Sequence, residues 1–265
     1  MDGIRCRNRP VGFSFIQIAR DLQDVIFHRR ILYVIMVWLK RCIAILRGNT
    51  PGGEDECMLR NIIFDMGNVL IKYDPTYFIR RAGVDDPQDQ TLLLDAIFRS
   101  ADWPLLDMGA LTETELLSRV CNRLPARLHS VARELVFNWD KPLVPIPGMA
   151  EFIQDCKRRG LGIYLLSNAS CRQPEYWDNV PGSAYFDGTV ISAFQRCTKP
   201  APEIYECLLK HFDLNADECL FVDDVDENVR GAERVGMHGF LFDDNVAELR
   251  ETVYNMLIDR GIAAR

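Results

Sequence analysis

Short apolar runs alternate with longer amphipathic stretches along residues 61–259. The apolar runs predict strands at 61–64, 163–166, 189–192, 219–222 and 239–242. Helices are predicted at 202–212, 227–235 and 246–259, with a further helix between Gly148 and Gly160. Strands that are apolar on both faces are typical of parallel sheets covered on both sides. The alternation therefore predicts an α/β fold, a mostly parallel sheet with helices on both faces.

A block without any strand pattern, from about residue 76 to 140, interrupts this alternation. Asp86-Pro87 is a typical helix start, with Asp as the N-cap and Pro at the first helical position. Thr112 and Glu115 have the spacing of a capping box before Leu116. We therefore expect a group of helices that stands outside the sheet.

The N-terminal 57 residues follow a different pattern. From Phe15 to Leu46 apolar residues recur in steps of three and four, with Arg29 as the one break, which predicts an amphipathic helix. The longest wholly apolar run, 31–39, has nine residues, whereas a spanning helix needs about 20. No transmembrane segment is therefore predicted. The Gly-rich and acidic stretch 48–57 is a linker.

Composition narrows the class of protein. With 48% hydrophobic and 26% charged residues, the 265-residue chain is typical of a soluble protein with a full core. The nine cysteines are scattered and include no C-x-x-C pair, which disfavours a disulfide framework or zinc ribbon and favours a reducing cytoplasmic location. The net charge of −7 argues against non-specific binding to nucleic acid.

The net charge divides unevenly between the two parts of the chain. Residues 1–50 carry nine basic and three acidic side chains, while 51–265 carry 22 and 35. Three interpretations of the extension 1–57 stay open. It is not native, because Met58 is the true first residue; or residues 13–47 contact an anionic membrane or a partner helix; or the segment is a degenerate targeting signal.

Polar side chains collect directly after the predicted strands. Asp65 follows the first, Ser167 and Asn168 the second, and Asp223 with Asp224 the fourth, while Lys199 precedes a helix. Taken singly, each has an ordinary structural role as a cap, turn or surface residue. Because ligands bind beyond the carboxyl ends of parallel strands, we expect these side chains to meet at one edge of the sheet.

Three clustered carboxylates repel one another unless a cation lies between them. Mg²⁺ suits such a site because it prefers oxygen ligands, water and substrate phosphate. An aspartate beside this ion is a plausible nucleophile toward phosphorus, forming an aspartyl-phosphate. Lysine, serine and asparagine donors would then stabilise the phosphoryl oxygens.

Four segments together resemble the ordered motifs of the haloacid dehalogenase (HAD) superfamily. They are Phe64-Asp65-Met66-Gly67-Asn68-Val69-Leu70, Leu166-Ser167-Asn168, Thr198-Lys199-Pro200 and Asp223-Asp224-x-x-x-Asn228. The first is similar to the D-x-G-N-V branch, which includes bacterial α-D-glucose-1-phosphate phosphatase. The resemblance implies a Rossmann-like core over 58–75 and 145–265 and an inserted helical cap over 76–144.

The resemblance also implies a role for each matching residue. Asp65 is the nucleophile and a Mg²⁺ ligand, and the backbone carbonyl of Gly67 is a second ligand. Asp224 is a third ligand, with Asp223 acting directly or through water.

The remaining motif residues are implied to handle the phosphoryl group. Ser167 and Lys199 bind it, and Lys199 also neutralises the nucleophile. Asn168 lies beside them and contacts substrate, while Asn228 braces the loop.

Gly67 departs from most phosphatases of the superfamily, which carry a second aspartate there as general acid and base. Leaving-group protonation is typically worth ~10²–10⁴-fold in rate. Another donor or water would have to supply this proton, and Asp74 and residues of the cap are the candidate donors. Residues near Asp107-Met108-Gly109 are expected to reach the active site when the cap closes, or else only to pack helices, as expected for Trp103, Leu105 and Leu106.

These observations favour a Mg²⁺-dependent phosphatase acting on a small phosphorylated metabolite, with a sugar phosphate as one candidate. Two alternatives stay open. The first is a dehalogenase-type hydrolase that uses the same aspartate to attack carbon, a reaction that needs no metal. The second is a catalytically weak HAD-fold binding protein, which is suggested by Gly67 at the position of the usual general acid. A phosphomutase would be expected to keep the second acid.

Overall fold

A five-stranded parallel sheet is the centre of the fold. The computed structural model describes residues 59–258, so the helix and linker predicted within 1–57 lie outside the described residues. The strand order is β3-β2-β1-β4-β5, and every neighbouring pair is parallel. The strands are β1 (Asn61–Phe64), β2 (Gly162–Ser167), β3 (Gly188–Ile191), β4 (Cys219–Asp223) and β5 (His238–Leu241). The α/β class is confirmed, and each strand lies within one residue of its predicted bounds.

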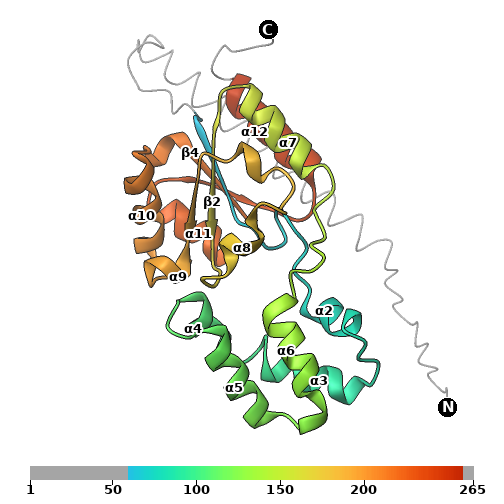
Figure 1. Ribbon diagram of the computed structural model, residues 1–265. Coiled ribbons are helices and arrows are strands. Elements are labelled where there is room, and N and C mark those ends of the chain that lie inside the picture. The colour runs from blue at the N-terminus through green and yellow to red at the C-terminus, as the bar shows by residue number, and fades with distance from the viewer. Residues whose placement is uncertain (1–58, 259–265) are drawn as a thin grey trace, which may run out of the picture. The chain divides into compact units, whose positions relative to one another are not determined.

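Helices cover both faces of this sheet. Figure 1 shows α7 (Met149–Arg158) beside α12 (Val246–Ile258) on one face, with α10 (Pro202–Phe212) and α11 (Asp226–Arg234) on the other. The alternation of side chains along β1 explains this arrangement. Ile62 and Phe64 belong to the apolar cluster under α7 and α12, while Ile63 belongs to the cluster under α10 and α11.

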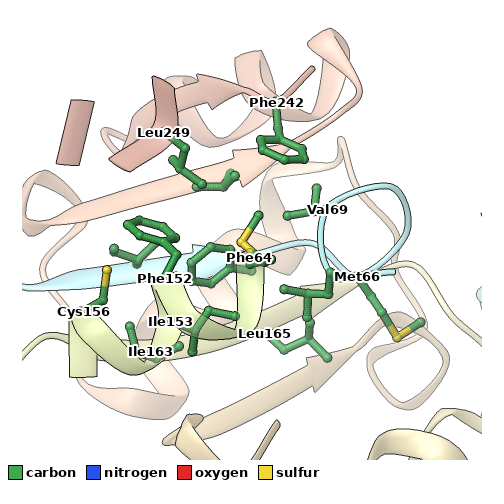
Figure 2. Packing of buried hydrophobic residues seen from close by; sticks show 14 of the residues in the cluster. Phe64, Met66, Val69, Phe152, Ile153, Cys156, Ile163, Leu165, Phe242 and Leu249 are labelled. Atoms are coloured by element: carbon green, nitrogen blue, oxygen red, sulfur yellow. The ribbon is translucent and has the colours of Figure 1, made fainter. Parts of the chain in front are cut away.

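Phe64 sits within the larger of these clusters. Figure 2 shows its ring close to Phe152 and Ile153, both from α7. The Phe64 and Phe152 rings meet edge to face, with their centroids 6.4 Å apart. All four residues of β1 are buried, which is why this strand is apolar on both faces.

Between β1 and α7 the chain forms five helices, here called the helical insert. They are α2 (Pro75–Arg81), α3 (Pro87–Ala96), α4 (Trp103–Asp107), α5 (Glu113–Arg123) and α6 (His129–Asn138). Figure 1 shows them grouped beyond the carboxyl ends of the strands. Both predicted start signals are confirmed: Asp86 accepts hydrogen bonds from two backbone N–H groups, and Thr112 with Glu115 forms a capping box. The division into cap and core at 76 and 144 stays a prediction.

The helical insert has its own apolar core, separate from the two clusters on the sheet. Leu93, Leu116, Val120 and Leu135 lie at its centre. The amphipathic pattern of α5 explains this packing, because Leu116, Leu117 and Val120 form its buried side.

The shorter elements connect these parts. They are α8 (Gln173–Trp177), α9 (Ser192–Gln195) and the 3₁₀ turns η1 (Ala126–Leu128), η2 (Ser183–Tyr185) and η3 (Ala216–Glu218). The third strand was predicted to include Ser192, but this residue begins α9 because its hydroxyl bonds the backbone of Ala169. None of the helices between residues 59 and 258 is long and apolar enough to cross a bilayer.

Two neighbouring leucines of α3 test the core of the helical insert. Leu93 is 0% exposed, whereas Leu92 is 41% exposed. Leu93→Ala is expected to lower the free energy of unfolding by about 2–5 kcal/mol, because it opens a cavity. Leu92→Ala is the matched control, with an expected change within about 0.5 kcal/mol. Urea denaturation followed by circular dichroism measures both, and equal losses would contradict the assigned packing.

Candidate functional site

The strand order creates a switch point at β1. From β1 the sheet continues to β2 and β3 on one side and to β4 and β5 on the other. Crevices beyond the carboxyl ends of strands at such points are the usual ligand sites of open α/β sheets. Asp65 directly follows β1, Ser167 ends β2 and Asp223 ends β4. The fold thus brings the predicted residues to one edge.

Three carboxylates form a cluster at this edge. Asp65, Asp223 and Asp224 each offer an oxygen, and these oxygens lie within 4.8 Å of one another. Asp65 and Asp223 are buried and Asp224 is half-buried. Burial, followed by the charge of Asp223, raises the pKa of Asp224, although a hydrogen bond from Asn68 opposes the shift. This all-oxygen donor set fits a hard divalent cation such as Mg²⁺.

Lys199 is the cation that the chain itself places in the cluster. Its Nζ lies 2.6 Å from Asp65 Oδ1 and 2.7 Å from Asp223 Oδ2, and its side chain is 1% exposed. One ammonium cannot balance three carboxylates. Burial therefore raises the pKa of Asp65 to about 7, with Asp223 adding to the shift and Lys199 opposing it. A second cation between the carboxylates would relieve this electrostatic cost.

Asn68 connects the loop after β1 to the loop after β4. Its φ of 53° is left-handed, a conformation that Asn adopts more readily than most residues. Its side chain donates to Asp224 Oδ2 at 3.0 Å and accepts from the Tyr73 backbone N–H at 2.9 Å. The sequence motif contains Asn68, but no role was predicted for it.

Two further asparagines hold the charged groups in place. Asn168 accepts from the Lys199 backbone N–H at 2.9 Å and donates to the Lys199 carbonyl at 3.0 Å. Asn228 donates to both oxygens of Asp223 at 3.1 and 3.2 Å, which agrees with its predicted bracing role. The substrate contact predicted for Asn168 stays a prediction, since its amide already binds the backbone.

A cavity of about 370 Å³ lies between the sheet edge and the helical insert. Asp65, Gly67, Ser167, Lys199 and Asp224 are on its core side. Five of the other lining residues are aromatic and form what is here called the aromatic wall: Tyr73, Phe98, Trp103, Trp139 and Tyr176. Neighbouring rings of the wall contact one another. The ring centroids of Tyr73 and Trp139 are 5.3 Å apart, and those of Phe98 and Trp103 are 4.8 Å apart. The sequence did not reveal this wall, because the aromatic residues are far apart along the chain.

Gly67 lines the cavity, and the space around it does not require a glycine at this position. A Cβ atom there would lie 3.5 Å from Tyr73 Cβ, which is an ordinary contact. Asp74, one of the alternative donors, is exposed, and its carboxylate caps α2 by accepting from the Thr76 N–H at 2.8 Å. The cavity lining does not include Asp74.

Hydrogen bonds hold the α4–α5 corner of the helical insert against the core. Ser192 Oγ donates to the backbone carbonyl of Asp107 at 2.6 Å, and Ser170 Oγ donates to Glu113 Oε1 at 2.6 Å. Gly109 has a φ of +66°, and a Cβ there would be 2.3 Å from the Ala193 carbonyl oxygen. Only glycine permits this approach. Arg196 also donates to the Gly109 carbonyl.

Asp107 and Glu113 are the acidic groups that the helical insert contributes to the cavity. Of the expected region around 107–109, Asp107 lines the cavity, and so do Trp103 and Leu106; that this region acts on substrate when a cap closes stays a prediction. Burial, then the charges of Asp65 and Glu113, raise the pKa of Asp107 to about 7, although Lys199 opposes the shift. The sequence pointed to this region but did not distinguish Asp107 within it.

Comparison with known proteins agrees with this geometry. A family model described as haloacid dehalogenase-like hydrolase matches residues 59–236. The chain belongs to this family. The HAD fold and the hydrolase class expected from the four motifs are therefore confirmed.

Similar HAD proteins include two named phosphatases. A sesquiterpene phosphatase from Aspergillus oryzae is 30% identical over 72% of this chain and 95% of its own length. A D-ribitol-5-phosphate phosphatase from Bacteroides thetaiotaomicron is 27% identical over 69% of this chain and 91% of its own length. A HAD-family enzyme from Bacteroides thetaiotaomicron, crystallised with magnesium and inorganic phosphate, superposes with a TM-score of 0.54 at 21% identity. The superposition covers 70% of this chain and 95% of that structure, and it shows that the two proteins share a fold.

The raised pKa of Asp107 predicts a measurable pH dependence of stability. Between pH 4 and 7 the folded protein keeps a proton that the unfolded chain, with its ordinary pKa of 3.8, has released. The free energy of unfolding therefore falls as pH rises through this window. Asp107→Asn should make the fall shallower by at most about 1.4 kcal/mol per pH unit. Urea denaturation with EDTA at pH 5 to 7 measures it; parallel curves for both proteins would contradict the burial of this carboxyl.

Proposed function

We propose that this HAD hydrolase is a Mg²⁺-dependent phosphatase of small phosphorylated metabolites that works through an aspartyl-phosphate on Asp65. The single observation that carries the proposal is the group of charged side chains on the core side of the cavity. There a buried aspartate lies 2.6 Å from a lysine ammonium and within 4.8 Å of two more carboxylates. The similarity to the two phosphatases described above supports the same reaction.

In the proposed reaction a carboxylate oxygen of Asp65 attacks phosphorus as the bond from phosphorus to the leaving oxygen breaks. Ser167 and Lys199 bind the phosphoryl oxygens, whose charge must be stabilised in the transition state. Lys199 also fixes the nucleophile through its ion pair. Water then hydrolyses the aspartyl-phosphate and releases inorganic phosphate.

Asp65, the Gly67 carbonyl and Asp224 are the proposed ligands of Mg²⁺. When bound, this ion supplies neutralising charge to the phosphoryl oxygens. Asp223 already accepts hydrogen bonds from Lys199, Asn228 and the Val225 N–H. These contacts favour the second of the two roles implied for Asp223, in which it holds Mg²⁺ through a water molecule and not directly.

The helical insert is the proposed cap, with the core formed by 58–75 and 145–265 and the cap by 76–144. Closure of such an insert excludes water from the reacting groups. The contacts of Ser192 and Ser170 with Asp107 and Glu113 support this role, since they join the two parts directly over the cavity.

The aromatic wall favours a substrate with an apolar organic group over a sugar phosphate. Buried hydroxyl groups of a sugar would each need a hydrogen-bond partner, which the aromatic wall supplies poorly. A hydrocarbon group gains free energy from the same rings. The similarity to a sesquiterpene phosphatase points in this direction as well.

Asp65→Asn tests the nucleophile. We expect phosphate release to fall by a factor on the order of 10³ or more, because the amide cannot attack phosphorus. Malachite-green detection of phosphate is applied to a sesquiterpenyl monophosphate, D-ribitol 5-phosphate and a hexose phosphate. The wild type should prefer the first by at least about tenfold in kcat/KM, since each buried methylene contributes about 0.8 kcal/mol.

The same panel distinguishes the alternatives. Equal turnover by Asp65→Asn would refute the nucleophile, and preference for the hexose phosphate would refute the substrate class. Halide release from a 2-haloacid in the presence of EDTA would instead support the dehalogenase-type reaction. Tight binding of a phosphate ester without turnover would support a binding protein.

Metal binding is tested by thermal denaturation. Mg²⁺ should raise the Tm of the wild type, because ligand at 100 times its Kd stabilises the folded state by about 2.7 kcal/mol. Asp224→Asn should reduce this shift, since it removes one carboxylate from the cluster. Asp213→Asn, at an exposed left-handed position after α10, is the matched control and should keep the full shift. Equal Mg²⁺ shifts in both variants would contradict the assigned site.

A further inference from the structure

The proposed reaction lacks a proton donor on the core side of the cavity. An alkoxide leaving group needs a proton as its bond to phosphorus breaks, and Gly67 has no side chain to provide one. Asp74 caps α2 and is exposed. Apart from water, the next candidates for the donor are the acidic side chains that the helical insert brings to the cavity.

Asp107 is held at this place by its own backbone. It ends α4, and its carbonyl oxygen accepts the Ser192 hydroxyl at the carboxyl end of β3. Two residues later Gly109 lies against the Ala193 carbonyl so closely that no Cβ fits. The position of Asp107 over the sheet edge is thus fixed by contacts with the core at the residue itself and two residues after it.

The carboxyl of Asp107 is free for a substrate. Within residues 59–258 it forms no hydrogen bond and no ion pair, although it lines the cavity and is partly buried. Glu113, the other acid of the insert, already accepts a hydrogen bond from Ser170. The asymmetry between the two acids singles out Asp107.

Burial first, and then the charged groups around Asp107, raise its pKa and so favour its protonated form. Asp65 faces it from the end of β1 and Glu113 from the start of α5, and Lys199 partly offsets both. Tyr73 and Tyr176, from the aromatic wall, are the other titratable groups close enough to interact with it. A neutral carboxyl can donate a proton at neutral pH, as the missing acid should.

We propose that Asp107 is the general acid and base of this enzyme, supplied by the helical insert in place of a residue at Gly67. As the bond from phosphorus to the leaving oxygen breaks, Asp107 gives its proton to that oxygen and becomes a carboxylate. In the second step it accepts a proton from the water that attacks the aspartyl-phosphate. Phosphate leaves, Asp65 is again a carboxylate, and Asp107 is again protonated. The inference rests on the proposed phosphatase reaction.

The test compares two leaving groups in Asp107→Asn. kcat/KM for an alkyl phosphate such as decyl phosphate should fall roughly 10²–10⁴-fold, because its alkoxide needs the proton. kcat/KM for p-nitrophenyl phosphate should change little, because p-nitrophenolate leaves without one. Its kcat should fall, since water is no longer deprotonated, and a burst of p-nitrophenolate should show that the aspartyl-phosphate accumulates.

Asp74→Asn is the matched control, because asparagine also caps a helix and the residue lies outside the cavity. It should keep the kcat/KM of the wild type for both substrates. Equal losses of kcat/KM on both substrates in Asp107→Asn, or no loss, would overturn the assignment, as would a leaving-group-dependent loss in Asp74→Asn. A wild type that does not hydrolyse p-nitrophenyl phosphate would instead refute the proposed function itself.

Discussion

One buried ammonium shared by two aspartates is the interaction on which the site depends. Lys199 Nζ contacts both Asp65 and Asp223; the lysine and Asp223 are almost fully buried, and the Asp65 side chain is 13% exposed. Breaking such a buried pair by removing one partner typically costs about 3–5 kcal/mol, because the remaining charges are left uncompensated. Lys199 therefore stabilises this edge of the folded sheet, in addition to its proposed role in binding the phosphoryl group. The asparagine at 168 holds the lysine backbone at both its N–H and its carbonyl.

The cluster around Lys199 carries more negative than positive charge, and this excess extends into the rest of the cavity. Asp224 extends the cluster toward the loop after β1, where Asn68 meets it. The helical insert then brings two more acids over the same space. The mutual repulsion of these acids raises the free energy of the site when it holds no ligand. A cation bound together with a phosphoryl group would relieve this repulsion. Catalytic sites typically hold such preorganised charges, placed to stabilise charge that develops during a reaction.

The sheet and the core side of the site could be predicted from sequence because their signals are local. Each strand is a short apolar run, and Asp65, Ser167 and Asp223 stand directly at strand ends, so parallel topology alone brings them together. The aromatic wall has no such signal, since Tyr73, Trp103 and Tyr176 meet only after the helical insert has packed on the core. The start of α9 at Ser192 was missed for the same reason: its hydroxyl bonds a loop 23 residues away along the chain.

The helical insert has a hydrophobic core of its own, and this has a consequence for how the enzyme can change. Phe98 and Trp103 pack against that core and line the cavity, while Asp65, Lys199 and Asp224 belong to the sheet and its loops. These rings of the proposed substrate-selecting surface are thus supported by other buried side chains than the carboxylate cluster at the sheet edge, whereas Asp107 belongs to the insert. Substitutions can reshape the first without disturbing the packing under the second. One catalytic platform can in this way serve new substrates through changes confined to a single contiguous stretch of chain.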